Sequence, residues 1–192
     1  ICRVLTDVSK ADATAYLLPG ETVQFALQAG KEEFAFTNQA LLTLRGESST
    51  TTRKIVTRYD YKSHIIAHVQ FETAGLVDRD CELKFVVGDK HFSIDVAKGD
   101  ESEVRVIYKV LELVSRKQKE HERTWEFGRL ALDASSKALR LSENSNQSLT
   151  KQSDETLEWL EALYVRTHPR CYREVIIAAF QTVRTDLKTQ DG

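Results

Sequence analysis

The stretch His64–Glu72 has the sequence HIIAHVQFE, in which side-chain character changes with a period of two. Ile65, Ala67, Val69 and Phe71 fall on one face of this stretch, and the remaining residues fall on the other. Successive side chains of a β-strand point to opposite faces of a sheet. The period therefore predicts a strand whose face formed by Ile65, Ala67, Val69 and Phe71 is buried.

Short runs of similar character lie on both sides of this stretch and are joined by turn residues. Gly88-Asp89-Lys90 separates two of them at the length of a hairpin connection. Strands at this spacing, joined by tight turns, predict an antiparallel meander sheet or small barrel. The runs are Glu21–Gln28, Glu33–Thr37, Ala40–Arg45, Thr52–Arg58, Glu82–Val87 and His91–Val96.

The period becomes helical after Asp100. Val104, Ile107, Leu111 and Val114 follow the spacing of an amphipathic helix, which predicts a helix over about Asp100–Arg116 with Asp100 as its N-cap. Three more apolar helical patterns lie at residues 125–141, 157–164 and 172–187. They are separated by a polar loop at 142–152, by Ser153 or Asp154 as the cap of the second helix, and by the break Thr167-His168-Pro169. These helices either close on each other or pair between chains, and both arrangements stay open.

Composition and charge exclude several classes of protein. The 192 residues are 41% apolar and 29% charged, with a net charge of −2, which favours a packed core over a disordered chain. This balance argues against a nucleic-acid binder, which would carry a basic excess. Three widely spaced cysteines (Cys2, Cys81 and Cys171) indicate a reducing, intracellular compartment. We expect the cytoplasm, or an organelle if a targeting segment precedes Ile1.

No motif for catalysis or cofactor binding is found. Glycine-rich phosphate loops and the G-x-S-x-G nucleophile turn are absent. His64, His68 and Glu72 share one face of the predicted strand, but positions four apart on a strand are ~13 Å apart, too far for one metal ion. The sequence therefore predicts no catalytic residue, no cofactor and no metal site.

Arginines cluster before the last predicted helix. Arg166, Arg170 and Arg173 would either bind an anion near the helix N-terminus or form ion pairs at the surface. The ion-pair interpretation is the favoured one.

Three segments resemble the bacterial-type pleckstrin-homology (PH) domain family. Phe71–Lys84, FETAGLVDRDCELK, is similar to the family motif F-x-x-E-(T/S)-A-G-x-x-D-x-D-x-E-L-x-(I/V). The motif positions in place are Thr73, Ala74, Gly75, Asp78, Asp80, Glu82 and Leu83. Glu33–Leu42 resembles the family's FTN-x-x-L stretch. Tyr59–Ile65 resembles its (I/V)PY-(K/S)-x-I segment, with Asp60 where the family often has proline.

The resemblance implies an α+β fold: a PH-like antiparallel barrel or bent sheet, capped by an amphipathic helix and followed by a helical subdomain. We expect an N-terminal segment at 1–19, a PH-like domain at 20–117 and a helical extension at 118–192, similar to the oligomerisation region that follows some family members. Gly75, Asp78 and Asp80 would define a turn, with Gly75 in a conformation that only glycine tolerates well.

The function that follows is a non-enzymatic assembly module that binds protein partners or itself. Aromatic side chains dominate interface energetics, so the predicted anchors are Trp125, Phe127, Trp159, Tyr164 and Phe180. The same residues would instead form the core of the helical subdomain if its helices close on each other.

The alternative is a membrane or lipid adaptor. The first loop of the PH-like domain, Gln28–Glu33, has one lysine against two glutamates and would repel anionic head groups as much as attract them. Lipid binding would therefore need a basic face assembled from Arg53, Lys54, Arg58 and Lys62.

Overall fold

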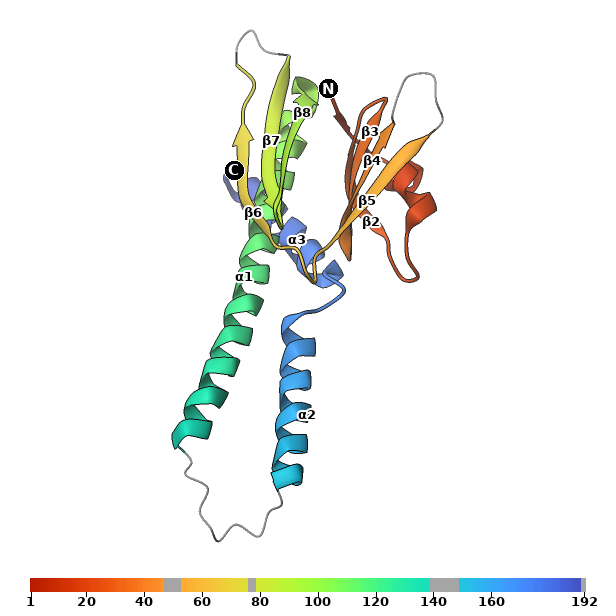
Figure 1. Cartoon of the computed structure of the whole chain (residues 1–192). Coiled ribbons are helices and arrows are strands. Elements are labelled where there is room, and N and C mark those ends of the chain that lie inside the picture. Colours follow the sequence, from red (N-terminus) through yellow and green to blue (C-terminus); the bar gives the residue numbers. More distant parts are fainter. Residues whose placement is uncertain (47–52, 76–78, 139–148, 191–192) are drawn as a thin grey trace. The chain divides into compact units, whose positions relative to one another are not determined.

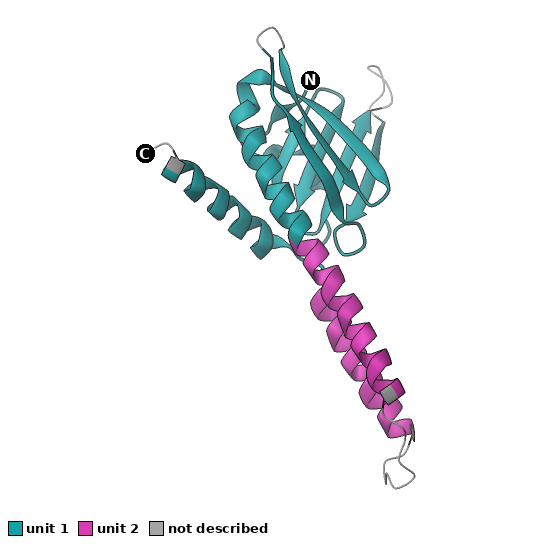
Figure 2. Cartoon of the chain, turned by 90° about the vertical axis from the view of Figure 1, so that its left-hand side faces the viewer, with its two compact units in different colours: residues 1–116, 170–192 teal, residues 117–169 magenta. Residues whose placement is uncertain are grey.

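The computed structural model describes residues 1–46, 53–75, 79–138 and 149–190. The chain forms two compact units (Figure 2): unit 1 comprises residues 1–116 and 170–192, and unit 2 comprises residues 117–169. Each unit is described by itself below.

Unit 1 contains two antiparallel sheets (Figure 1). The five-stranded sheet has the order β1-β2-β3-β4-β5, and the three-stranded sheet has the order β6-β7-β8. This confirms the predicted antiparallel, PH-like α+β fold. The strands are β1 (Arg3–Val4), β2 (Val23–Gln28), β3 (Glu32–Thr37), β4 (Ala40–Gly46), β5 (Lys54–Asp60), β6 (Ile66–Glu72), β7 (Asp80–Val87) and β8 (Lys90–Ala97).

Phenylalanines from both sheets form the centre of the core. Phe25 stacks on Phe36 with ring centroids 4.4 Å apart, and Phe85 stacks on Phe92 at 5.1 Å. Phe36 joins the two pairs because its ring lies 5.6 Å from that of Phe85. Each of these rings comes from an inward position of an alternating strand, so the period of two places them together.

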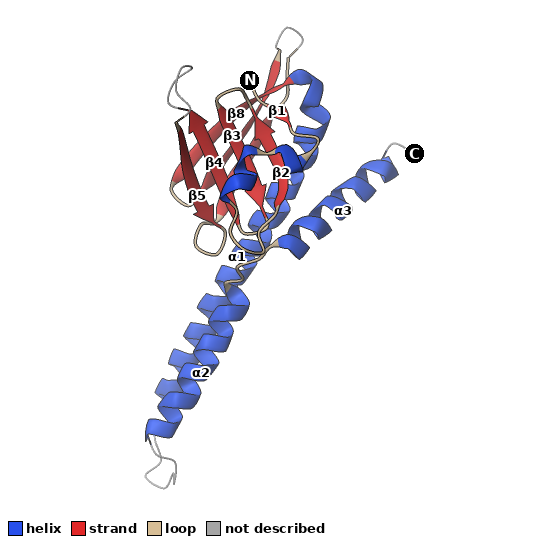
Figure 3. Ribbon diagram, turned by 90° about the vertical axis from the view of Figure 1, so that its right-hand side faces the viewer, coloured by secondary structure: helices blue, strands red, loops and turns tan. Residues whose placement is uncertain are grey.

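The helices follow the strands (Figure 3). They are α1 (Glu101–Ala138), α2 (Leu149–Thr167) and α3 (Arg173–Gln190), and short 3₁₀ turns occupy Val8–Lys10, Asp12–Tyr16 and Lys98–Asp100. The first part of α1 buries the predicted stripe of Val104, Ile107, Leu111 and Val114 in the core of unit 1.

Two predicted helix boundaries differ from the structure. α1 does not end near residue 116 but continues to Ala138, because the charged stretch after Ser115 has no glycine or proline until Gly128 and includes an ion pair one turn apart, Lys117 to Glu120. α2 begins at Leu149, before the predicted caps. Asp100 also differs from its predicted role, since its carboxylate accepts hydrogen bonds from the Arg3 side chain and the Val4 amide.

The period of two breaks within β6. The register with β7 shifts between Ala67 and Gln70, and His68 has a φ of 50°, the left-handed region. This bulge puts one extra residue into β6, so Ile66 is fully buried although the sequence predicted it outside. Beyond the bulge, Val69 is buried as predicted.

α3 belongs to unit 1, which differs from the predicted helical extension 118–192. Tyr172, just before α3, and Ile176, Ala179 and Val183 within it lie in the same core cluster as the sheets. Residues 1–19 also lie in unit 1, where Ala11 and Ala13 cover the outer face of the five-stranded sheet. The apolar stripe of α3 thus lies in the core that the sheets form together with the first part of α1.

Candidate functional site

Unit 2 is a pair of helices that lie side by side (Figures 1 and 2). Its close contact is at Gly128 of α1, where an added Cβ would lie 2.3 Å from a methyl group of Leu163 in α2. Leu163 is buried there, so the missing side chain of Gly128 lets α2 approach the backbone of α1. This glycine is required by a close approach of two helices.

An aromatic cluster forms one end of this helix pair. Tyr164 stacks on His168 with ring centroids 4.1 Å apart, and the Trp125 ring meets both edge to face at 5.5 and 5.6 Å. Arg129 places its guanidinium 6.0 Å from the Trp125 ring centroid. These contacts fix the pairing of α1 with α2 in unit 2.

A second set of apolar side chains in unit 2 faces outward. Two helices bury only the stripes along their shared seam, so apolar residues elsewhere stay in contact with water. Phe127 is 62% exposed and Val165 is 70% exposed. We call the exposed apolar residues of unit 2 the hairpin surface: Phe127, Leu130, Leu157, Trp159, Tyr164 and Val165.

Charge is distributed unequally between the two helices of unit 2. The α2 sequence carries four acidic residues (Asp154, Glu155, Glu158 and Glu161) against two basic ones, Lys151 and Arg166. Residues 117–138 of α1 carry five basic residues against four acidic ones. The two helices therefore have charges of opposite sign.

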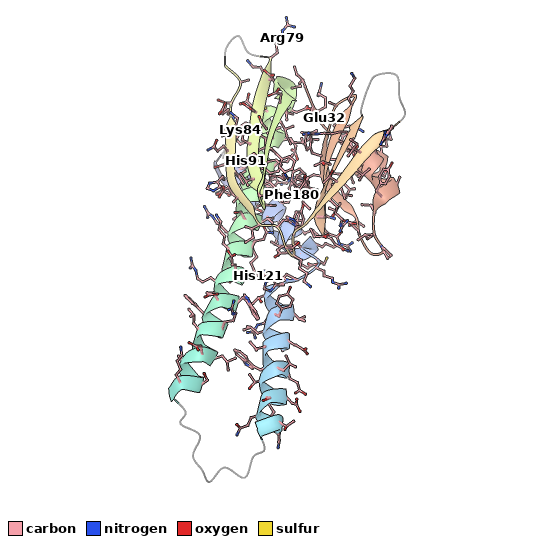
Figure 4. All side chains as sticks on the ribbon, in the orientation of Figure 1. Glu32, Arg79, Lys84, His91, His121 and Phe180 are labelled. Atoms are coloured by element: carbon pink, nitrogen blue, oxygen red, sulfur yellow. The ribbon has the colours of Figure 1, made fainter. Side chains whose placement is uncertain are left out.

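His121 lies on α1 in unit 2 (Figure 4). Burial lowers the pKa of His121 below its ordinary value of 6.5, and the positive charge of Lys117 lowers it further. Glu120 acts in the opposite direction, and His168 adds to the lowering. The folded unit therefore favours the neutral form of the His121 imidazole over the protonated form.

The structure divides the five predicted anchors between the two units. Trp125, Phe127, Trp159 and Tyr164 lie in unit 2. Phe180, labelled in Figure 4, lies in unit 1. The Phe180 ring packs edge to face on Phe25 at 5.6 Å and is partly buried. Its role as an interface anchor, like that of the other four, stays a prediction.

Sequence reasoning missed three members of the hairpin surface and the close contact at Gly128. Leu130 and Leu157 lie within the predicted apolar patterns 125–141 and 157–164 but were not predicted as anchors, and Val165 lies outside every predicted pattern. A signal for the close contact was present in Gly128, because a glycine inside a helix costs about 1 kcal/mol relative to alanine unless something requires it.

The predicted turn residues are only partly described. Asp80 begins β7, and Asp78 lies outside the described residues. The carbonyl of Gly75 accepts a hydrogen bond of 2.8 Å from Lys98 Nζ. The special backbone conformation proposed for Gly75 stays a prediction.

Two cations of the basic face proposed for lipid binding are engaged in ion pairs. Lys54 pairs with Asp12, and Arg58 pairs with both Glu21 and Asp60. Lys84 and His91 lie on the three-stranded sheet (Figure 4), where Lys84 is paired with Glu72 and Glu82. The described residues of the sheets thus offer little unpaired positive charge.

The cysteines are free thiols. Cys2 and Cys81 are buried, and burial raises the pKa of each thiol, with Glu101 adding to the effect at Cys81. Cys171 is exposed and accepts a hydrogen bond of 3.2 Å from Asn38 Nδ2. A raised pKa makes the two buried thiols poor nucleophiles.

The two-sheet core closed by α1 corresponds to a known family. The family model described as "Bacterial PH domain" matches residues 2–114. The chain belongs to the bacterial PH domain family. The match extends over β1 to β8 and the first part of α1, so this PH domain includes the N-terminal segment that the sequence placed outside it.

Relatives of this bacterial PH protein share both parts of the chain. The crystal structure of a PH-domain-containing bacterial protein from Exiguobacterium sibiricum 255-15 is 34% identical, with a TM-score of 0.85, and covers 93% of this chain and 98% of its own. The uncharacterized protein YvbH of Bacillus subtilis strain 168 is 29% identical over 175 residues, which is 88% of this chain and 86% of that protein. The similarity therefore extends beyond the PH domain into the helices.

Two other classes of feature are absent from the described residues. None of the helices in the described residues combines the length and apolarity needed to cross a bilayer. Within the same residues, no three His, Cys, Asp or Glu side chains are grouped so that they would hold a metal ion.

Proposed function

We propose that this bacterial PH protein is a non-enzymatic assembly module that associates with a second copy of itself through the hairpin surface of unit 2. One observation carries the proposal: six large apolar side chains on two adjacent helices are exposed in the single chain. A concentration of exposed large apolar side chains on one part of a protein indicates an interaction site.

Covering this surface would contribute favourable free energy to association. Burying one large apolar side chain is worth about 1.5–3 kcal/mol. Phe127, Leu130, Leu157 and Val165 would each gain a part of that amount when covered, because each is more than half exposed. Trp159 adds an aromatic anchor of the kind that dominates interface energetics.

Charge favours a second copy as the occupant. A two-fold axis brings α1 of one copy against α2 of the other, as in four-helix bundles. The acidic excess of α2 would then face the slightly basic segment 117–138. Each copy thus offers one acidic helix and one slightly basic helix segment, which would be complementary in charge across the two-fold axis.

The test is light scattering on the full-length protein and on the double variant Phe127→Ser/Val165→Ser. We expect the wild-type chain to be a dimer or higher oligomer and the variant to shift towards the monomer. Trp159→Ala should weaken association in the same direction. Unchanged far-ultraviolet circular dichroism would show that each variant is still folded.

Two controls separate this surface from others. Tyr16→Ser removes an exposed aromatic side chain of unit 1 and should leave the mass unchanged. Ile55→Ser alters an exposed residue on β5, an edge strand of the five-stranded sheet. If Ile55→Ser dissociates the protein and the double variant does not, assembly uses the sheet edge and the proposal is wrong. A monomeric wild-type protein would also refute it.

A further inference from the structure

Two histidines of unit 2 lie near the Trp125 ring. His121 precedes Trp125 by one helical turn on α1, so the two side chains fall on the same face of that helix. His168 directly follows α2, and its ring meets the Trp125 ring edge to face at 5.6 Å. When His168 is protonated, its charge lowers the pKa of His121, so the two imidazoles lie near each other.

The His168 ring is held in place by the end of α2. It stacks on Tyr164 with ring centroids 4.1 Å apart, and its Nδ1 lies 3.2 Å from the Tyr164 carbonyl oxygen and 3.0 Å from Thr167 Oγ1. The backbone amide of His168 donates to the same carbonyl at 2.8 Å. The imidazole is thus fixed against the ring of Tyr164, which is a member of the hairpin surface.

The surroundings of His121 oppose its protonation while the helices are paired. Lys117 lies one turn before it on α1, and burial together with this positive charge lowers the pKa of His121. Glu120 acts in the opposite direction, but its carboxylate is paired with Lys117 at 2.9 Å. A proton on His121 would therefore be added beside an existing positive charge.

The α2 side of the cluster adds no negative side chain among its ring contacts in the described residues. Its ionisable members are Tyr164 and His168. Arg129 of α1 places a further positive charge 6.0 Å from the Trp125 ring centroid. Protonation of both imidazoles would thus concentrate positive charge where the two helices meet.

The hairpin surface depends on the pairing of these helices. Phe127 and Leu130 belong to α1, whereas Trp159, Tyr164 and Val165 belong to α2. These side chains keep their relative positions only while α1 and α2 are paired. A change that separates the helices would therefore also disrupt the surface.

We propose that His121 and His168 form a pH switch, which separates the helices of unit 2 in acid and so releases the assembly formed through the hairpin surface. The inference rests on the proposed assembly and adds its regulation. Because the pKa of His121 is lowered in the folded unit, the separated helices take up a proton at a higher pH than the paired helices do. Pairing is therefore fully favoured above the ordinary value of 6.5 and weakens as the pH falls below it.

Light scattering of the full-length protein at pH 7.5 and pH 5.5, over a range of protein concentrations, tests the proposal. We expect the dissociation constant of the wild-type assembly to rise about tenfold or more at the lower pH, because each unit of pKa difference in either copy changes it by up to a factor of ten. His121→Gln should abolish most of this rise, since glutamine gains no charge in acid. The matched control is His91→Gln, at an exposed histidine of β8 in unit 1, which should dissociate in acid as the wild type does.

Two further variants alter charge and keep most of the packing. His168→Phe retains a ring to stack on Tyr164 but cannot be protonated, and Lys117→Gln removes the positive charge beside His121. Both should reduce the rise in the dissociation constant. A rise of the wild-type size in His121→Gln or in Lys117→Gln would overturn the proposal, as would a wild-type assembly that is equally tight at both pH values.

Tryptophan emission separates a failure of the switch from a failure of the assembly. Both tryptophans lie in unit 2, and Trp125 contacts His168, so the emission reports on helix pairing without any association. A wild-type chain that is monomeric at pH 7.5 refutes the assembly, and the emission then decides on the switch alone. A shift to longer wavelength in acid that His121→Gln removes supports the switch, whereas no shift, or one that His121→Gln leaves intact, overturns it.

Discussion

Glu21 is a buried carboxylate whose charge is kept by its neighbours. Burial alone would raise the pKa of Glu21, but hydrogen bonds from Arg58, from the Thr37 hydroxyl and from the Leu18 amide hold it below the ordinary value of 4.5. A carboxyl with a lowered pKa stabilises the folded state above its unfolded pKa, and this contribution is lost as the pH falls through the lower, folded value.

We expect Glu21→Gln to lower the free energy of unfolding by about 3 kcal/mol, because it leaves the partly buried Arg58 with one carboxylate. Asp60→Asn is the matched control. It removes the other partner of Arg58, but Asp60 is half exposed, so the loss should be smaller. Urea denaturation at pH 7 measures the free energy of unfolding of both variants. Equal losses of stability in the two variants would contradict the conclusion that Glu21 is the more important partner of Arg58.

Gly128 permits the close approach of the two helices in unit 2. Gly128→Leu should lower the stability of unit 2 by about 1–3 kcal/mol, because the new side chain would overlap Leu163. Ser135→Leu, at an exposed position of the same helix, should have little effect. Both tryptophans of the chain, Trp125 and Trp159, lie in unit 2, so denaturation followed by tryptophan fluorescence reports on this unit. A more stable Gly128→Leu variant would refute the prediction.

The helix pair of unit 2 should also respond to pH through His121. The pKa of His121 is lowered in the folded state, so the unfolded chain takes up a proton at a higher pH than the folded chain. The fluorescence-detected stability should therefore fall as the pH drops below about 6.5. His121→Gln should flatten the dependence between pH 6.5 and 5, and an unchanged slope would show that another group is responsible.

The elements differ in how far the sequence predicts them. Strands and helices were predictable because the spacing of their apolar residues follows from local backbone geometry. The hairpin of β7 and β8 around the Gly88 turn is an example. The bulge at His68 was not predictable, because one extra residue leaves the period of two intact on either side. The packing partner of α3 was not predictable either. An apolar stripe such as Ile176 and Val183 shows that one face of the helix is buried, but it does not show which element covers that face.

The candidate surfaces were less predictable than the fold. Trp159 and Phe127 were identified from residue type alone, and only the structure separates them from Phe180, which packs on Phe25. A pocket of unit 1 is lined by Arg58 and Arg170, which are 112 positions apart in the sequence, and no local pattern connects them.

Removal of the helices has different consequences according to where the chain is cut. A chain ending at Arg116 lacks Tyr172, Ile176, Ala179 and Val183, all of which lie in the core of unit 1. We expect this truncation to be less stable by several kcal/mol, since truncating even one large apolar core side chain costs about 2–5 kcal/mol. Replacing residues 117–169 by a flexible glycine–serine linker keeps α3 and should preserve most of the stability of unit 1.

Circular dichroism during thermal unfolding of the two shortened proteins measures the difference. If the chain ending at Arg116 unfolds at the same temperature as the linker variant, α3 does not contribute to the core. The same result decides which shortened protein is suitable for light scattering. A destabilised truncation would aggregate for reasons unrelated to the hairpin surface.

The return of α3 to unit 1 sets an order for folding during synthesis. Nascent domains fold as units while the chain emerges from the ribosome, the earlier parts first. The sheets of unit 1 are made early, but Phe25 stays without its contact to Phe180 until residues 173–190 have been made. The helix pair of unit 2, formed from adjacent segments, emerges whole before that point. An interval therefore exists in which the PH core still exposes the apolar side chains that α3 will cover, while the helices of unit 2 have already paired.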